Sequence, residues 1–212
     1  MAELSDWGGN VLDLACGAGA NLFYFAKKYP EVEWVGMDID EELLKIFPRY
    51  GQCIDNVKLT QGDWFSLPDK YVGFFEGIIS LQTLSWLPEW QEPLKQVCKL
   101  QPKWFAMSSL FYEGDMDYII KCYNYERPDE KHGRDYTEGY YNIYSLPHIK
   151  RFLASMGYGK FIYEPFEIDV DIPRPKSYDW GTYTETTSDG RRLQLSGALL
   201  MPWYFIYAEK TA

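Results

Sequence analysis

The sequence has too few basic residues for a typical nucleic-acid-binding protein. Its 21 Lys and Arg residues stand against 31 Asp and Glu residues, which gives a formal net charge of −10. A protein that contacts many phosphates normally presents a basic face. We therefore expect no nucleic acid among its partners.

The sequence also has few histidines, no recognisable cysteine pattern and no long apolar run. The four cysteines are scattered and show neither metal-ligand nor redox spacing, and there are only two histidines. No apolar run approaches the ~20 residues that cross a bilayer, and the N-terminus lacks a signal-peptide pattern. These absences predict a cytoplasmic protein with free thiols, no bound metal and no membrane span; a homodimer is one option for its assembly.

The chain has the length of a single domain, 1–212. Between residues 9 and 110 short apolar strands alternate with helical stretches, which is typical of a parallel sheet with helices on both faces. The expected strands are 10–15, 33–38, 57–61, 74–81 and 104–110, and the expected helices are 21–29, 41–47 and 90–100. Ligands of such sheets bind at the carboxyl ends of the strands, so we look for the site there.

Residues 111–144 break this alternation. They are polar, rich in Tyr and without a clear period, and a segment of this length is more often functional than a plain connection. Tyr combines apolar area with a hydrogen-bonding tip, so these side chains either pack the segment onto the core or line a binding wall. We predict that 111–144 is an insertion that serves as a lid or a substrate wall.

Regular structure is expected to return in the C-terminal half, 145–212. Ser145 is a candidate N-cap for a helix over 145–156, which Gly157 would end. Strands are expected at 160–170 and 202–209. Asp189-Gly190 lies between two β-like runs, and this predicts an additional hairpin over 183–196.

The most informative segment is Val11-Leu12-Asp13-Leu14-Ala15-Cys16-Gly17-Ala18-Gly19. Glycines at a strand-to-helix turn let the backbone approach a ligand closely, and the helix beyond them offers unpaired N–H groups. A dinucleotide fingerprint would carry a third glycine where this chain has Leu22. The segment resembles the first motif of class I S-adenosylmethionine-dependent methyltransferases, in which an acidic residue ends the first strand just before Gly-x-Gly.

This resemblance implies a fold and a cofactor. The fold would be Rossmann-like: a seven-stranded, mostly parallel sheet with helices on both faces and an antiparallel last strand, here with the Tyr-rich insertion and the extra hairpin. The cofactor would be S-adenosyl-L-methionine, bound by residues 9–110. From the first turn, the resemblance assigns Asp13, Ala15, Gly17 and Gly19 to cofactor binding.

Two further strand ends match the family's pattern. Asp38 ends the second strand, where the family's carboxylate accepts hydrogen bonds from both ribose hydroxyls; alternatively it caps the helix that begins near Asp40, or the two residues divide these roles. Asp63 follows the third strand and would accept the adenine amino group, with Ile39 and Trp64 on either side of the ring. The alternative is a plain Gly-Asp turn at this position.

The loop after the fourth strand would face the methyl group of the cofactor. We assign Gln82 to a contact there and Ser80 to a contact that is mainly through its backbone. The alternative is that Ser80 and Thr83 only end the strand.

Candidates for the chemistry itself lie in the insertion. An alcohol acceptor needs a general base, and His132 is our candidate, with Glu113, Asp115 and Asp117 as rivals. Tyr112, Arg127 and Arg134 are candidate substrate contacts, and the two arginines, with Lys131, would suit an anionic acceptor. A solvated loop of mixed charge is the alternative.

Taken together, these patterns predict an S-adenosylmethionine-dependent methyltransferase. We expect O-methylation of a small polar or anionic metabolite or a sugar-type acceptor, because 145–156 and 199–205 look similar to methyltransferases of bacterial surface-polysaccharide biosynthesis. One alternative is an NAD-dependent oxidoreductase, against which Asp13 and Leu22 argue. The other is a non-catalytic S-adenosylmethionine-binding or partner protein, since the family's usual N-terminal cover is missing; we expect a truncated chain or a lid formed by 111–144.

Overall fold

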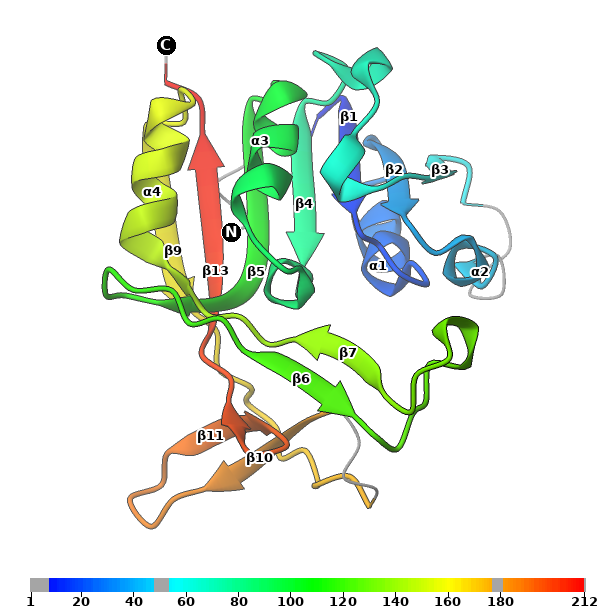
Figure 1. The fold of residues 1–212 in the computed structure, drawn as a ribbon. Coiled ribbons are helices and arrows are strands. Elements are labelled where there is room, and N and C mark those ends of the chain that lie inside the picture. The colour runs from blue at the N-terminus through cyan, green and yellow to red at the C-terminus, as the bar shows by residue number, and fades with distance from the viewer. Residues whose placement is uncertain (1–7, 48–53, 177–180, 212) are drawn as a thin grey trace.

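The computed structural model describes residues 8–47, 54–176 and 181–211. Its main sheet has the strand order β3-β2-β1-β4-β5-β13-β9, and the two-residue β8 pairs with β5 beside this path. β1 to β5 are parallel, whereas β13 runs antiparallel to both of its neighbours, β5 and β9 (Figure 1). The Rossmann-like sheet with an antiparallel last strand is therefore confirmed.

Most elements begin and end close to where the sequence places them. The strands of the main sheet are β1 (Asn10–Leu14), β2 (Glu33–Asp38), β3 (Val57–Gln61), β4 (Gly77–Leu81), β5 (Trp104–Tyr112), β8 (Tyr144–Ser145), β9 (Lys160–Pro165) and β13 (Trp203–Glu209). The helices are α1 (Ala20–Lys28), α2 (Glu41–Leu44), α3 (Gln91–Lys99) and α4 (Leu146–Ser155), and short 3₁₀ turns lie at η2 (Trp64–Ser66), η3 (Asp69–Tyr71) and η4 (Leu84–Trp86). β9 is five residues shorter than expected and ends at Pro165.

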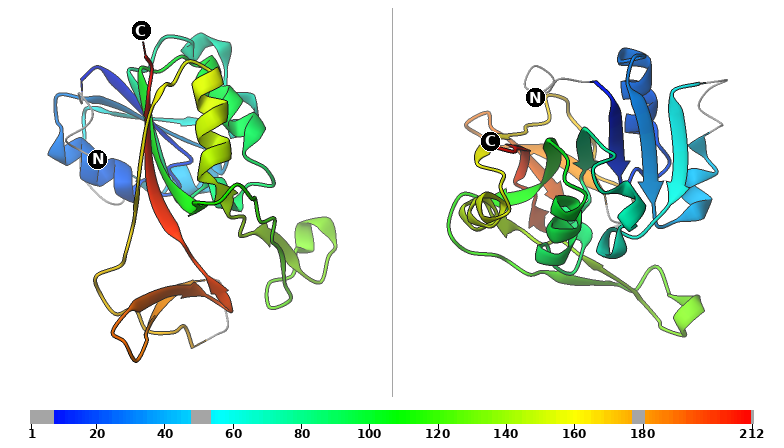
Figure 2. Two further views of the ribbon diagram at one scale, coloured as in Figure 1. Left: turned by 90° about the vertical axis from the view of Figure 1, so that its left-hand side faces the viewer. Right: turned by 90° about the horizontal axis from the view of Figure 1, so that it is seen from above.

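Helices cover both faces of the sheet. α1 and α2 lie on one side, and α3 and α4 lie on the other (Figure 2). Adjacent strand residues separate between the two apolar cores: Leu12 and Ile78 pack on the side of α3 and α4, and Val11 and Ile79 pack on the side of α1. This alternation is why the central strands are apolar at nearly every position.

The structure explains why the first turn carries Leu22 instead of a third glycine. Leu22 is fully buried between α1 and the sheet, and a Cβ added at Gly36 of β2 would lie only 2.6 Å from its side chain. The close approach of helix and strand is thus provided by a glycine on the neighbouring strand, and Leu22 fills the space above it.

The two additions to the main sheet lie below the carboxyl ends of its parallel strands (Figure 1). The insertion forms a hairpin of β6 (Lys121–Asn124) and β7 (Thr137–Tyr140), with a 3₁₀ turn, η5 (Glu130–His132), near its tip. The C-terminal half adds a three-stranded sheet of β10 (Thr182–Thr186), β11 (Arg192–Ser196) and β12 (Leu199–Leu200). We call these two small sheets the accessory layer.

An apolar cluster joins the accessory layer to the domain. It contains Leu110 of β5, Tyr141, Met201 and Trp203, with Cys122 of β6 packed against it. No local pattern in the sequence indicates the β6–β7 hairpin, because within β6 only Cys122 and Asn124 face inward, and Lys121 and Tyr123 are exposed. The hairpin expected at 183–196 is present, with Gly190 at φ +84°, and β12 extends it.

Candidate functional site

A cavity of about 490 Å³ opens at the carboxyl ends of β1, β2, β3 and β4. Its volume is within the range of small-molecule sites. The lining residues are Leu14, Ala15, Asp38, Ile39, Gly62, Asp63, Trp64, Phe65, Gln82, Thr83, Trp86 and Leu87. The structure therefore brings together Ala15, Asp38, Ile39, Asp63, Trp64 and Gln82 from the set that the sequence singled out.

The glycine turn is fastened to the end of β2. The backbone N–H of Gly17 donates a hydrogen bond of 2.7 Å to Oδ2 of Asp38. Gly17 has φ +56°, and a Cβ there would enter open space, whereas a Cβ at Gly19 (φ +83°) would collide with the ring of Phe47. Neither glycine lines the cavity; Gly17 orients its wall, and Gly19 is required by protein packing.

Of the two neighbouring carboxylates, Asp40 is the one that caps the helix. Asp40 caps α2, since its Oδ1 accepts hydrogen bonds from the N–H groups of Glu42 and Leu43. Asp38 remains in the cavity wall, and its second oxygen, Oδ1, accepts from the Asp40 N–H at 2.9 Å. Both oxygens of Asp38 are thus held in place by backbone donors, and the carboxylate is preorganised.

Asp13 and Ser80 lie beneath the cavity and do not line it. Asp13 is 1% exposed, and burial, with a smaller contribution from Asp38, raises its pKa to about 7. Oδ2 of Asp13 and Oγ of Ser80 have no hydrogen-bond partner among the described residues. Buried polar atoms are rarely left unpaired in native proteins, so burying these two atoms without a partner costs the fold free energy.

The backbone is strained at two points of the cavity wall. Ala15 and Gln82 adopt left-handed conformations, with φ of +61° and +66°. Such a conformation costs a residue with a Cβ roughly 1–2 kcal/mol and persists where the surrounding structure enforces it, often at ligand sites. Gln82 is held by its N–H, which donates to the carbonyl of Ser108 at 2.8 Å.

The side chains of Trp64 and Phe65 have different surroundings. The indole of Trp64 is buried, and its Nε1 donates to the carbonyl of Pro93 at 2.9 Å. Oδ1 of Asp63 accepts from the Phe65 N–H, so Asp63 also forms the turn that the alternative reading expected. Phe65 lines the cavity and is half-buried; the sequence does not single it out, because the neighbouring Trp is the larger ring.

Trp86 and its neighbours form a wall that sequence reasoning also missed. The carbonyls of Ser85 and Leu87, on either side of Trp86, accept hydrogen bonds from the backbone N–H and from Nδ2 of the buried Asn142. The hydroxyl of Tyr144 donates to the Leu87 carbonyl as well. The ring of Trp86 packs on Tyr141 at 4.6 Å between centroids, so this wall depends on residues that follow the β6–β7 hairpin.

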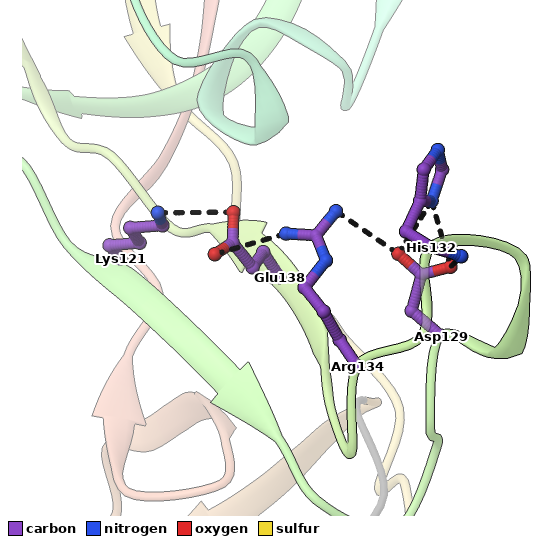
Figure 3. A network of polar contacts seen from close by, with 5 residues as sticks. All are labelled: Lys121, Asp129, His132, Arg134 and Glu138. Carbon is purple, nitrogen blue, oxygen red and sulfur yellow. Dashed lines mark hydrogen bonds and ion pairs between the residues drawn. The ribbon is translucent and has the colours of Figure 1, made fainter.

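The candidate catalytic and substrate residues lie outside the cavity wall. His132 and Arg134 are near the tip of the β6–β7 hairpin, where both contact Asp129, at 2.8 Å and 3.2 Å (Figure 3). Arg134 also pairs with Glu138, which in turn binds Lys121. The positive charge of Arg134 is therefore compensated by two carboxylates.

The other candidates in the insertion are similarly placed. Arg127 follows β6, and Tyr112, at the end of β5, is exposed and packs edge-to-face on Tyr118. Of the rival bases, Asp115 binds Arg151, and Asp117 accepts from the indole N–H of Trp90. The described residues contain no group of His, Cys, Asp and Glu side chains that could hold a metal ion.

Comparison with known proteins agrees with this geometry. A family model described as a methyltransferase domain matches residues 5–117, more than half of the chain. The chain belongs to this methyltransferase family. The resemblance drawn from the sequence is confirmed, and with it S-adenosylmethionine as the family's cofactor.

The curated relatives each match less than half of this chain. Over 85 residues it is 33% identical to the ribosomal RNA small subunit methyltransferase H of Coprothermobacter proteolyticus, which covers 37% of this chain and 28% of that protein. The chain spans less than half the length of the curated relatives it matches.

Solved structures match over nearly the whole chain at low identity, so they show the fold alone. A structure from Listeria monocytogenes, described as an S-adenosylmethionine-dependent methyltransferase, has a TM-score of 0.61 at 15% identity and covers 100% of this chain and 94% of its own. The N-terminal domain of EvdMO1, determined with S-adenosylhomocysteine and D-fucose, has a TM-score of 0.58 at 14% identity and covers 96% and 76%. In the described part of this chain no helix is long and apolar enough to cross a membrane.

Proposed function

We propose that this protein transfers the methyl group of S-adenosylmethionine to an oxygen atom of a small polar or sugar-type acceptor. The observation that carries the proposal is the preorganised end of β2. There Asp38, held by the N–H groups of Gly17 and Asp40, stands in the wall of a cavity whose backbone is strained at Ala15 and Gln82.

The residues of the cavity fit the cofactor. In this proposal Asp38 accepts the two ribose hydroxyls and Asp63 accepts the adenine amino group, with the half-buried Phe65 and the exposed Ile39 also lining the cavity. Asp13 and Ser80 lie beneath these groups and supply the unpaired polar atoms, and Asp13 would stabilise positive charge above it as a carboxylate. Bound S-adenosylmethionine supplies a methyl group already activated on a sulfonium, so the chain's part is to bind, orient and exclude water.

The acceptor would lie against Trp86, Thr83 and Leu87. The ring of Trp86 is partly exposed at the cavity, and rings of this kind suit the apolar face of a sugar. The net charge of −10 disfavours an RNA acceptor, although one relative is described as a ribosomal RNA methyltransferase. One structural neighbour was crystallised in the presence of D-fucose, which supports a sugar-type acceptor. We place the reaction in surface-polysaccharide biosynthesis in the cytoplasm.

An alcohol acceptor also needs a base. The titratable side chains in the cavity wall, Asp38 and Asp63, are those assigned to the cofactor. We therefore keep His132, held through Nδ1 by Asp129, as the base, with Tyr112, Arg127 and Arg134 as further acceptor contacts. This requires the segment 111–144 to act as a lid that brings the tip of the hairpin over the cavity.

Two measurements test the proposal. Calorimetric titration with S-adenosylmethionine and with NAD identifies the ligand, and binding of NAD alone would overturn the proposal. Transfer of a labelled methyl group into fractionated glycans, small metabolites and RNA of the host then identifies the acceptor. Label in RNA would show that the acceptor is RNA and not a small polar or sugar-type molecule. Cofactor binding without transfer to any fraction would favour a non-catalytic protein.

A further inference from the structure

The main sheet has an open edge at β9. This strand is last in the sheet order and pairs with β13 alone among the described residues. The Phe166 N–H donates to the Trp203 carbonyl in the same register that pairs Ile162 with Tyr207. Because inward and outward bonding alternate in an antiparallel ladder, the backbone groups of Lys160, Ile162 and Glu164 face β13. Those of Phe161 and Tyr163 face outward and are open to another strand.

The side chains along this edge have a self-complementary order. Ile162 at the centre is 37% exposed, and Lys160 and Glu164 flank it at equal distances along the strand. Lys160 binds Glu209 and lies over the ring of Tyr207, whereas Glu164 has no ion-pair partner among the described residues. In an antiparallel copy of the strand, Glu164 would therefore lie where the first strand has Lys160.

We propose that β9 pairs with β9 of a second copy of this chain, antiparallel, about a two-fold axis at Ile162. Phe161 of each copy then lies opposite Tyr163 of the other, and these two pairs form four backbone hydrogen bonds. Lys160 of each copy lies opposite Glu164 of the other, in the non-hydrogen-bonded positions where Cα atoms approach to about 4.5 Å. A shift of the register by two residues would put Lys160 opposite Ile162 and lose both charge pairs.

The charges also argue for a second copy over an arbitrary strand. Charged side chains and proline on an edge strand normally prevent pairing with other chains, and Pro165 limits the length of the ladder here. Only a strand with the opposite charge order neutralises β9, and its own antiparallel copy has that order. The other edge, β3, carries Lys58 and no acidic residue, so it lacks this property.

This pairing is independent of the proposed function. The cavity lies at β1 to β4, and β5 and β13 separate it from β9 in the sheet. The interface is one short strand from each copy, so we expect a small contact with a dissociation constant in the micromolar range.

Sedimentation velocity of the full chain over about 1 to about 300 µM tests the pairing through charge reversal. The unchanged chain should form dimers, and Lys160→Glu and Glu164→Lys should each weaken them at least tenfold. Among the described residues E164K breaks no ion pair, whereas K160E breaks the pair with Glu209. K58E is the matched control, because Lys58, like Lys160, pairs with an acid on the neighbouring strand, here Glu33. Lys58 lies on β3, the other edge of the sheet, so K58E should dimerise normally.

The decisive sample is an equimolar mixture of K160E and E164K. One variant carries two acids on β9 and the other carries two lysines, so the mixture should form heterodimers although neither variant pairs with itself. A monomeric unchanged chain over this whole range would overturn the proposal. Single variants that dimerise as well as the unchanged chain, or a mixture that associates no better than its components, would overturn it as well.

Discussion

The cofactor half and the accessory layer treat polar groups in opposite ways. Around the cavity, Asp13 is buried with a pKa raised to about 7, and Ala15 and Gln82 are held in strained conformations. On the β6–β7 hairpin the charges of Lys121, Glu138, Arg134 and Asp129 lie at the surface and compensate one another (Figure 3). The first arrangement costs the fold free energy, whereas in the second the opposite charges compensate one another at the surface.

The largest expected effect concerns Asp13 and pH. Its carboxyl group binds its proton more tightly in the folded chain, with a pKa of about 7 against 3.8 when unfolded. Stability should therefore fall as pH rises from about 4 to about 7 and then level off, by up to about 4 kcal/mol. Asp13→Asn should remove this dependence. Urea unfolding of both proteins from pH 4.5 to 8, at about half-unit steps, measures the difference; parallel curves would show that Asp13 keeps an ordinary pKa.

A smaller effect separates the two neighbouring carboxylates. Asp38→Ala should weaken S-adenosylmethionine binding at least tenfold, about 1.4 kcal/mol, because it removes the proposed ribose acceptor and the anchor of the Gly17 N–H. Asp40→Ala is the matched control and should cost about 1 kcal/mol of stability through the lost cap of α2, with little change in affinity. Titration calorimetry of both variants measures their affinity for S-adenosylmethionine. Equal affinities of the two variants would show that Asp38 does not bind the cofactor.

Tyr144 and Tyr158 allow a test of the link between the accessory layer and the cavity. Both are fully buried, and each hydroxyl donates to a distant carbonyl, that of Leu87 for Tyr144 and that of Pro102 for Tyr158. Phenylalanine at either position should cost about 1 kcal/mol of stability. Only Tyr144→Phe should also raise the KM for the acceptor, since it loosens the wall that carries Trp86. Equal KM values for the two variants would mean that this wall does not depend on Tyr144.

The smallest effect on stability is expected at the tip of the hairpin. Arg134→Ala and His132→Asn should each change the free energy of unfolding by no more than about 0.5 kcal/mol, because exposed ion pairs contribute little. If His132 is the base, His132→Asn should lower kcat strongly while cofactor affinity is unchanged. Thermal unfolding and initial rates, measured on the same samples, separate the effect on stability from the effect on kcat. An unchanged kcat would show that His132 is not the base.

Much of the fold was readable from the sequence. Glu33–Asp38 and Val57–Gln61 were placed residue for residue, because short apolar strands between turn signals leave few alternatives. Ser145 was recognised as an N-cap, and its hydroxyl accepts from the His148 N–H. The β6–β7 hairpin was missed because it buries few apolar side chains, so its strands show no alternation of apolar and polar residues.

Within the site, the sequence by itself determined the placement of carboxylates at strand ends. Asp38 and Asp63 come together because parallel strands finish at one edge of the sheet, and that follows from the order of elements alone. Only the tertiary structure decided which side chains face the cavity. Trp64 turns into the core while Phe65 turns out, and Asn142, far along the chain, holds the wall beside Trp86. These outcomes depend on packing and hydrogen bonds between residues distant in sequence, which no local pattern encodes.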